Sequence, residues 1–197
     1  MKLVKKVKEL HSWAAEMCRQ TLEPLLYTAG IHVYAAGVRC ASLRLPKARL
    51  MVRGHRETFS RLHAAVDSWH EPVIWVHAAS LGEFEQARPL IAGIRARRPE
   101  ARIVLSFFSP SGYEVRKNWE GADVVVYLPF DTPRNVRKFL DIVRPEKAFF
   151  IKYEFWRNYL YGLWNRHVPT YLVSAVFRPE QAFFKRRRAW YRYWIRL

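Results

Sequence analysis

The sequence predicts an α/β fold, a Rossmann-like parallel sheet with helices on both faces. From residue 72 onward, short apolar, β-branched runs alternate with segments whose apolar residues recur at helical spacing. Consecutive parallel strands are joined by right-handed crossovers, so a series of such units forms one sheet that is covered on both faces. We therefore expect a single domain of this kind over residues 72–178 of the 197-residue chain.

Each strand is predicted by an apolar run of strand length, and each helix by its spacing or its first residues. The five expected strands span residues 73–78, 103–108, 124–128, 148–153 and 170–175. Apolar residues recur at helical spacing over residues 84–94, after the first strand. A turn at residues 109–112 opens a short helix after the second strand, and Pro133 lies near the start of the next helix. The last helix of the domain follows the fourth strand, from Phe155 onward.

Two segments precede the predicted domain. Residues 1–24 predict a basic helical extension that ends at Pro24, because proline cannot donate a backbone hydrogen bond. Residues 25–45 have the length of a membrane span, about 20 residues, but include histidine and arginine. We predict a membrane-anchor-like helix there, either a short span or a helix in the interface, followed by a basic connector to residue 71. An amphipathic helix packed on a soluble core is the alternative.

The charge of the chain predicts an anionic partner. Lys and Arg number 34 against 17 Asp and Glu, a formal charge of +17. An anionic membrane surface, a phosphorylated lipid and a nucleic acid all fit that charge. Residues 179–197 predict a basic aromatic amphipathic helix, a composition that favours the boundary between water and lipid headgroups. The same residue types stack on nucleic-acid bases, and a solvated helix with one buried aromatic face is the plainest alternative.

An acid at the end of the first predicted strand is the sharpest catalytic candidate. The strand runs directly into Ser80, Gly82 and Glu83, where a helix begins. The helix dipole and its free N–H groups favour an ionised Glu83, and an ionised carboxylate can take a proton from an attacking hydroxyl. Gly82 lets the backbone turn and lets a ligand approach. Alternatively, Glu83 is only a favourable first-turn acid, which forms a capping box with Ser80.

Further candidate site residues follow the second and fourth predicted strands. Glu154 follows the fourth strand, so a parallel sheet brings it to the same edge as Glu83; a capping acid is the alternative. Ser109, Ser111 and Gly112 offer hydroxyl and backbone N–H groups to an anion or a sugar. The chain lacks the glycine patterns of nucleotide sites and the histidine spacings of metal sites, so we expect neither a cofactor nor a metal.

Several ordered motifs resemble the N-terminal half of the 3-deoxy-D-manno-octulosonic acid (Kdo) transferases, which place Kdo on lipid A precursors. The resemblance covers about residues 26–197. It rests on YTAGIHVYAAGVRCASL at 27–43, LMVRG at 50–54, HAASLGE at 77–83, SPSGYE at 109–114, YLPFDTPRNVRKFLDIVRPE at 127–146 and YEFWRN at 153–158.

The resemblance implies the N-terminal half of a GT-B glycosyltransferase at the cytoplasmic face of the cell inner membrane. It implies that Glu83 is the general base, that the acceptor is a lipid A precursor, and that no metal is needed. The donor, CMP-Kdo, would bind mainly to a C-terminal domain. The implied acceptor-binding residues are Ser80, Gly82, Ser109, Ser111, Gly112 and Glu154.

Some residues depart from the family pattern. Lys152 stands where the family often has an acid, and Arg157 where it often has proline. The sequence also leaves no room for a second Rossmann-like domain, so a fragment of a longer enzyme is expected. A catalytically inactive, truncated membrane- or lipid-binding module is the alternative. A nucleic-acid-binding protein is the least favoured hypothesis, because it rests only on charge and aromatic residues.

Overall fold

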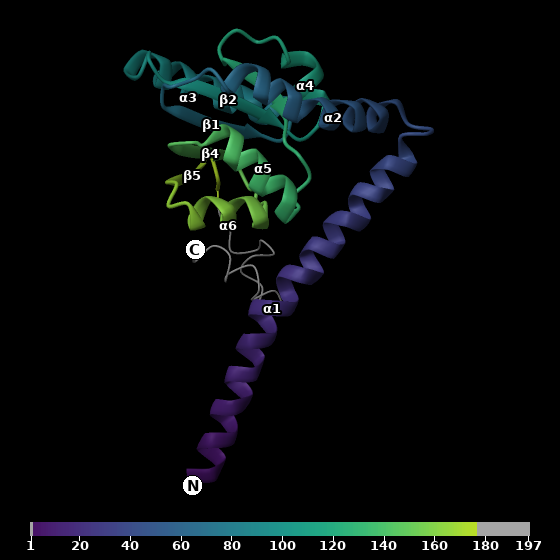
Figure 1. Cartoon of the computed structure of the whole chain (residues 1–197), viewed down its shortest axis with the longest axis vertical. Helices are drawn as coiled ribbons and strands as arrows, with labels where there is room; N and C mark the ends of the chain where they lie inside the picture. The colour runs from purple at the N-terminus through teal and green to yellow at the C-terminus, as the bar shows by residue number, and fades with distance from the viewer. Residues whose placement is uncertain (1, 177–197) are drawn as a thin grey trace.

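The computed structural model describes residues 2–176, with side chains from residue 22 onward. It confirms the predicted fold class, because all five strands pair in parallel in the order β3-β2-β1-β4-β5 (Figure 1). The strands are β1 (Val73–Ala78), β2 (Arg102–Phe107), β3 (Val124–Tyr127), β4 (Lys147–Ile151) and β5 (Thr170–Val173). The helices are α1 (Lys2–Ala41), α2 (Pro46–Val66), α3 (Leu81–Arg97), α4 (Pro110–Arg116), α5 (Pro133–Val143) and α6 (Arg157–Asn165). The helix expected at residues 179–197 lies outside the described residues.

Helices cover both faces of the sheet, with α3 and α4 on one side and α5 and α6 on the other (Figure 1). Alternate residues of β1 divide between the two resulting cores: Val76 joins the core under α3, and Trp75 joins the core under α5 and α6. Strands that are buried on both faces read as continuous apolar runs, which is why these strands were recognisable from sequence.

The fourth and fifth strands end earlier than predicted, for a conformational reason. The runs expected at 148–153 and 170–175 stop at Ile151 and Val173. The next residue in each case, Lys152 and Ser174, has a positive φ, of 60° and 58°. A left-handed residue breaks the extended conformation, so each strand stops two residues before the end of the predicted run.

The segment expected to be a basic connector is instead a helix of the domain. Helix α2 buries Leu62 and Val66 in the core beneath α5, and Thr58 donates a hydrogen bond to the carbonyl oxygen of Tyr127 on the edge strand β3. Gly54 allows this close approach, because a Cβ atom there would lie 2.1 Å from the Tyr127 ring. The helix therefore covers a sheet edge that would otherwise offer unpaired backbone groups.

Helix α1 does not end at Pro24, contrary to the expectation, but continues to Ala41. Proline removes one backbone donor, and the rest of the ladder continues on either side of it. One face of the C-terminal half of α1 packs on the domain through Ile31, Ala35 and Val38, as the packed-helix alternative predicts. In the part of the chain that the structure describes, no helix is both long enough and apolar enough to cross a membrane.

Candidate functional site

The two predicted acids flank the point where the strand order reverses. Strand β1 pairs with β2 on one side and with β4 on the other, so the chain changes direction between β1 and β4. Ligands of open α/β sheets bind outside the carboxyl ends of the strands at such a switch point. Glu83 follows β1 and Glu154 follows β4, which places both acids at this edge.

Glu83 is the third residue of α3, and its side chain turns back toward the strand. The backbone N–H of Ala79 donates to Glu83 Oε2 over 2.6 Å. Ser80 occupies the N-cap position, but its hydroxyl makes no capping hydrogen bond, so the reciprocal capping box does not form. Gly82 has no positive φ, and a Cβ atom there would meet nothing within 4 Å, so the turn itself does not require glycine.

Burial and the charge of Glu154 raise the pKa of the half-buried Glu83 above its usual value. The Ala79 N–H, His77 and Lys152 act in the opposite direction. A carboxylate with a raised pKa is a stronger base than an exposed one, and it sits where a ligand is expected.

The serine turn lies against the Glu83 turn. The backbone N–H of Ser109 donates to the carbonyl oxygen of Ala79 over 2.8 Å, and the hydroxyl groups of Ser109 and Ser111 lie 2.9 Å apart. Gly112 is buried, and a Cβ atom there would lie 2.3 Å from the Phe107 ring and 3.1 Å from the Ser80 carbonyl carbon. Packing therefore explains Gly112, whereas the exposed Ser111 remains open to a ligand.

Glu154 does not cap a helix. It precedes α6 by three residues, and its Oε2 accepts a hydrogen bond of 2.8 Å from Trp156 Nε1. The same oxygen lies 3.5 Å from Nε2 of the fully buried His77. Trp156 in turn packs on Phe108, with 4.5 Å between ring centroids. Glu154 is thus held at the edge of an aromatic surface, and its side chain stays 19% exposed.

The acid that caps α6 is Asp131, which the sequence analysis did not single out. Its carboxylate accepts backbone N–H groups from Asn158 and Tyr159, at 3.0 and 2.9 Å, and the Tyr27 hydroxyl at 2.7 Å. Burial raises the pKa of Asp131 to about 6. One side chain therefore links α1, the end of β3 and α6. Its only sequence signal was its place in the motif after the third strand.

Among the residues that the structure describes, no three His, Cys, Asp or Glu side chains gather where they could hold a metal ion. The carboxylates of Glu83 and Glu154 accept hydrogen bonds from the Ala79 backbone N–H and the Trp156 indole N–H. What the arrangement can do on its own is take a proton from a bound hydroxyl group.

Comparison with known proteins identifies the family. The sequence model of the 3-deoxy-D-manno-octulosonic-acid transferases (Kdo transferases) matches residues 53–196. This chain belongs to the Kdo transferase family. The matched residues include both acids and every residue of the serine turn, and the Rossmann-like fold agrees with the N-terminal half of a GT-B enzyme.

Curated Kdo transferases match about half of the chain. The 3-deoxy-D-manno-octulosonic acid transferase of Haemophilus influenzae is 33% identical over 103 residues, which is 52% of this chain and 24% of that protein. The Aquifex aeolicus enzyme is also 33% identical over 103 residues, which cover 28% of it. The Bordetella pertussis enzyme is 32% identical over 110 residues, 25% of its length. The matched part of the chain thus spans about a quarter of these relatives.

Proposed function

We propose that this chain is the acceptor-binding part of a glycosyltransferase that moves Kdo from CMP-Kdo to a lipid A precursor. In this proposal Glu83 is the general base. The observation that supports it best is the position of Glu83 at the strand-order switch point, where burial and the charge of Glu154 raise its pKa.

The proposed step needs one proton acceptor. Glu83 takes the proton of the acceptor hydroxyl while that oxygen forms a bond to the anomeric carbon of Kdo. The bond between this carbon and the phosphate oxygen breaks, and CMP leaves with the electron pair. The Ala79 N–H occupies Oε2 of Glu83, which leaves Oε1 for the incoming proton. A raised pKa brings the base closer to the working pH, where general-base catalysis is most efficient.

Binding of the acceptor to this chain tests the proposal without a donor. A soluble lipid A precursor titrated into the chain is expected to bind, and Ser111→Tyr, which fills the open side of the serine turn, is expected to weaken binding at least about tenfold. Ser68→Tyr, an exposed serine at the end of α2, is the matched control and is expected to bind as the parent chain does.

Equal affinity of both serine variants for the acceptor would place binding elsewhere and contradict the proposal. A second assay adds labelled CMP-Kdo to the transferase that carries this chain. Label in the lipid fraction supports transfer. Acceptor binding without label there favours the inactive lipid-binding module instead.

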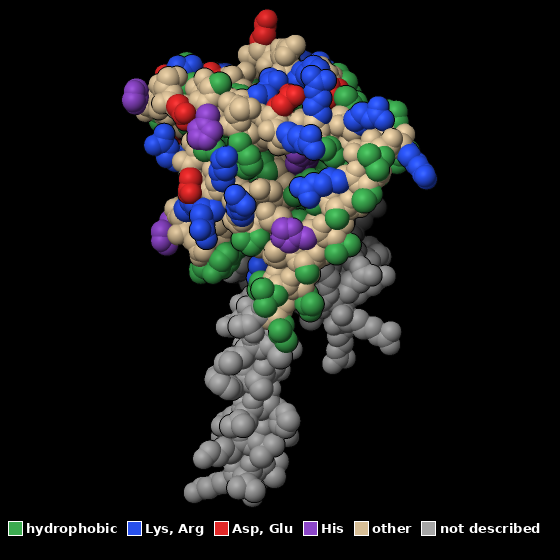
Figure 2. All heavy atoms as spheres, turned by 45° about the vertical axis from the view of Figure 1, so that its right-hand side comes forward, with side chains coloured by type: hydrophobic (Ala, Val, Ile, Leu, Met, Phe, Trp, Pro, Cys, Tyr) green, Lys and Arg blue, Asp and Glu red, His purple; other side chains and the backbone are tan. Residues whose placement is uncertain are grey.

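We also propose that the chain works at the cytoplasmic face of the cell inner membrane. The face of α1 that turns away from the domain is apolar, and it continues into the turn before α2. The most exposed apolar side chains there are Leu22, Leu25, Leu26, Val33, Leu43 and Leu45. Figure 2 shows hydrophobic side chains along this helix and Lys and Arg side chains gathered beside it. Such a combination favours the interface of an anionic membrane.

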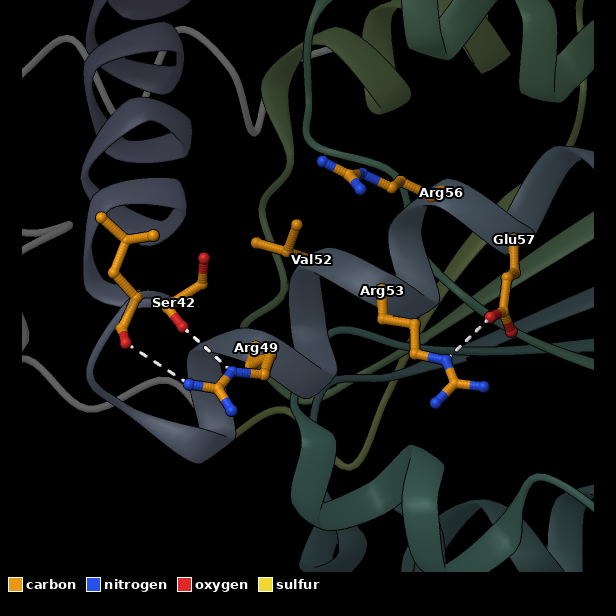
Figure 3. Close-up of a pocket in the computed structure, with 7 residues that line it drawn as sticks. Ser42, Arg49, Val52, Arg53, Arg56 and Glu57 are labelled. Carbon is orange, nitrogen blue, oxygen red and sulfur yellow. Dashed lines mark hydrogen bonds and ion pairs between the residues drawn. The ribbon is translucent and has the colours of Figure 1, made fainter.

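A basic hollow lies at the turn between α1 and α2 (Figure 3). It encloses about 400 Å³ and is lined by Arg49, Arg53 and Arg56, and also by Glu57, which pairs with Arg53. Arg49 is held by the carbonyl oxygens of Ser42 and Leu43, both at 3.3 Å. Each Lys or Arg near an anionic surface contributes about 1 kcal/mol, so this hollow adds to the apolar contact of α1.

Vesicle binding tests the membrane proposal. The chain is expected to sediment with vesicles that contain phosphatidylglycerol more than with pure phosphatidylcholine, and less at high salt. Leu25→Ser with Leu26→Ser is expected to reduce binding to the anionic vesicles at least about tenfold, because two apolar side chains no longer enter the interface. Val115→Ser, an exposed apolar residue on α4, is the control. Binding unchanged by the leucine substitutions would overturn this proposal.

A further inference from the structure

A histidine that the proposed reaction does not use is buried directly beneath the two acids. His77 is the fifth residue of β1, and its side chain is 0% exposed. Its Nε2 lies 3.5 Å from Glu154 Oε2 and has no hydrogen-bond partner among the residues that the structure describes. The nitrogen therefore points from the core toward the ligand edge of the sheet.

The other ring nitrogen of His77 is anchored. Nδ1 lies 2.9 Å from the Ser106 hydroxyl oxygen and 3.2 Å from the Ser106 carbonyl oxygen on β2. Trp75 Nε1 donates to the same hydroxyl over 2.8 Å. This buried chain of contacts fixes the plane of the imidazole, so that Nε2 is aimed at Glu154 and at little else.

The core neighbours of His77 account for only one of its two ring nitrogens. The rings of Trp75 and Phe150 lie 6.5 and 5.7 Å from the imidazole, centroid to centroid, and Ser106 pairs with Nδ1, so these neighbours leave Nε2 without a partner. A buried polar atom that lacks a partner costs about 1–3 kcal/mol. A group retained at such a cost is most simply explained by what it faces, which is a carboxylate of the candidate site.

We propose that His77 is a positioning residue: its Nε2 faces Glu154 across 3.5 Å and offsets the negative charge of that carboxylate, so that Glu83 is left as the proton acceptor. This inference rests on the proposed role of Glu83 as base. The charged groups that act on Glu83 are Glu154 and Lys152, both after β4, and His77 on β1. His77 is the one among them that is fixed within the sheet.

Carboxyl carbon NMR on the ¹³C-labelled 197-residue chain tests this inference without donor or acceptor. The Glu83 signal is assigned by its loss in Glu83→Gln and then followed through a pH titration. In His77→Phe, the midpoint of Glu83 is expected to rise by about 0.5–1 pH unit, because the charge of Glu154 is no longer offset. In Glu154→Gln the midpoint of Glu83 is expected to fall, because the negative charge of Glu154 is removed.

A second histidine variant and a double variant make the test decisive. His77→Gln keeps an amide that can bond to Ser106, so it gives the answer even where the Phe variant fails to fold. When either His77 substitution is made in the Glu154→Gln chain, the shift in the Glu83 midpoint is expected to be less than half of the shift in the parent chain. His63→Phe, at an exposed histidine of α2 that pairs with Asp67, is the control. An unchanged Glu83 midpoint, or a shift of equal size in both backgrounds, would overturn the inference.

Failure of this inference is distinguishable from failure of the proposed function. A Glu83 titration that is insensitive to His77 overturns the positioning role, whatever the transfer rate of the enzyme. Conversely, a transferase that keeps its rate in Glu83→Gln removes the base assignment, although the coupling of His77 to Glu154 would still be measurable in the spectra.

Discussion

Glu83→Gln is expected to lower the rate of Kdo transfer about 10²–10⁴-fold in the transferase that carries this chain, the usual contribution of a general base. The amide has nearly the same shape and can still accept the Ala79 N–H, but it cannot take up a proton at the pH of the reaction. Affinity for the acceptor and the thermal midpoint of unfolding are expected to change little. Initial rates at saturating acceptor, together with a thermal melt, measure all of this.

Glu85→Gln is the matched control, because it lies on the same helix two residues away. Glu85 pairs with Arg88 and Arg116 on the protein surface, and such exposed pairs contribute about 0–1 kcal/mol. Its substitution is expected to leave the transfer rate within about twofold. A Glu83→Gln enzyme that turned over as fast as Glu85→Gln would rule out Glu83 as the base.

The pH profile provides a second check on the same residue. Because the pKa of Glu83 is raised, the acidic limb of kcat/KM is expected to lie above the range of an ordinary glutamate. Glu154→Gln removes one cause of that shift and is expected to move the limb to lower pH. Lys152→Gln removes a positive charge that acts in the opposite direction, so the limb is expected to move to higher pH.

The parallel sheet was predictable because its signal is local. Strands β1 to β4 are mainly apolar and largely buried, as expected for strands covered on both faces, and Val73–Ala78 was predicted with its observed bounds. The position of Glu83 and Glu154 at one edge followed from the parallel order alone. Strand ends were less predictable, because the left-handed conformation of Lys152 leaves no trace in hydropathy.

What the sequence could not predict depends on contacts between distant segments. The role of α2 along β3 rests on Gly54 lying against Tyr127, which no periodicity indicates. His77 stood inside a recognised motif, but its link to Glu154 joins residues that are adjacent only after β1 pairs with β4. Asp131 is another case, because its three donors come from α1 and α6, on either side of it in the chain.

Asp131→Ala is expected to destabilise the fold by about 3 kcal/mol, through the loss of the α6 cap and of the hydrogen bond from the Tyr27 hydroxyl. Urea unfolding measures this change. Asp141→Ala is the control, because that exposed carboxylate pairs at the surface with Arg166 alone among the residues that the structure describes. A loss of stability no larger than that of the control would show that Asp131 does not link α1 to α6.

The pH dependence of the free energy of unfolding tests the buried state of the Asp131 carboxyl group separately. Its pKa is about 6 in the folded protein and 3.8 as an ordinary aspartate, so over that interval the folded state binds its proton more tightly than the unfolded chain does. The contribution of Asp131 to the free energy of unfolding is therefore fully present below pH 4. It falls by about 3 kcal/mol as the pH rises to 6, at 1.36 kcal/mol per pKa unit. In Asp131→Asn this part of the slope is expected to vanish. Parallel pH profiles for the parent chain and Asp131→Asn would mean that the carboxyl group is not buried as the structure has it.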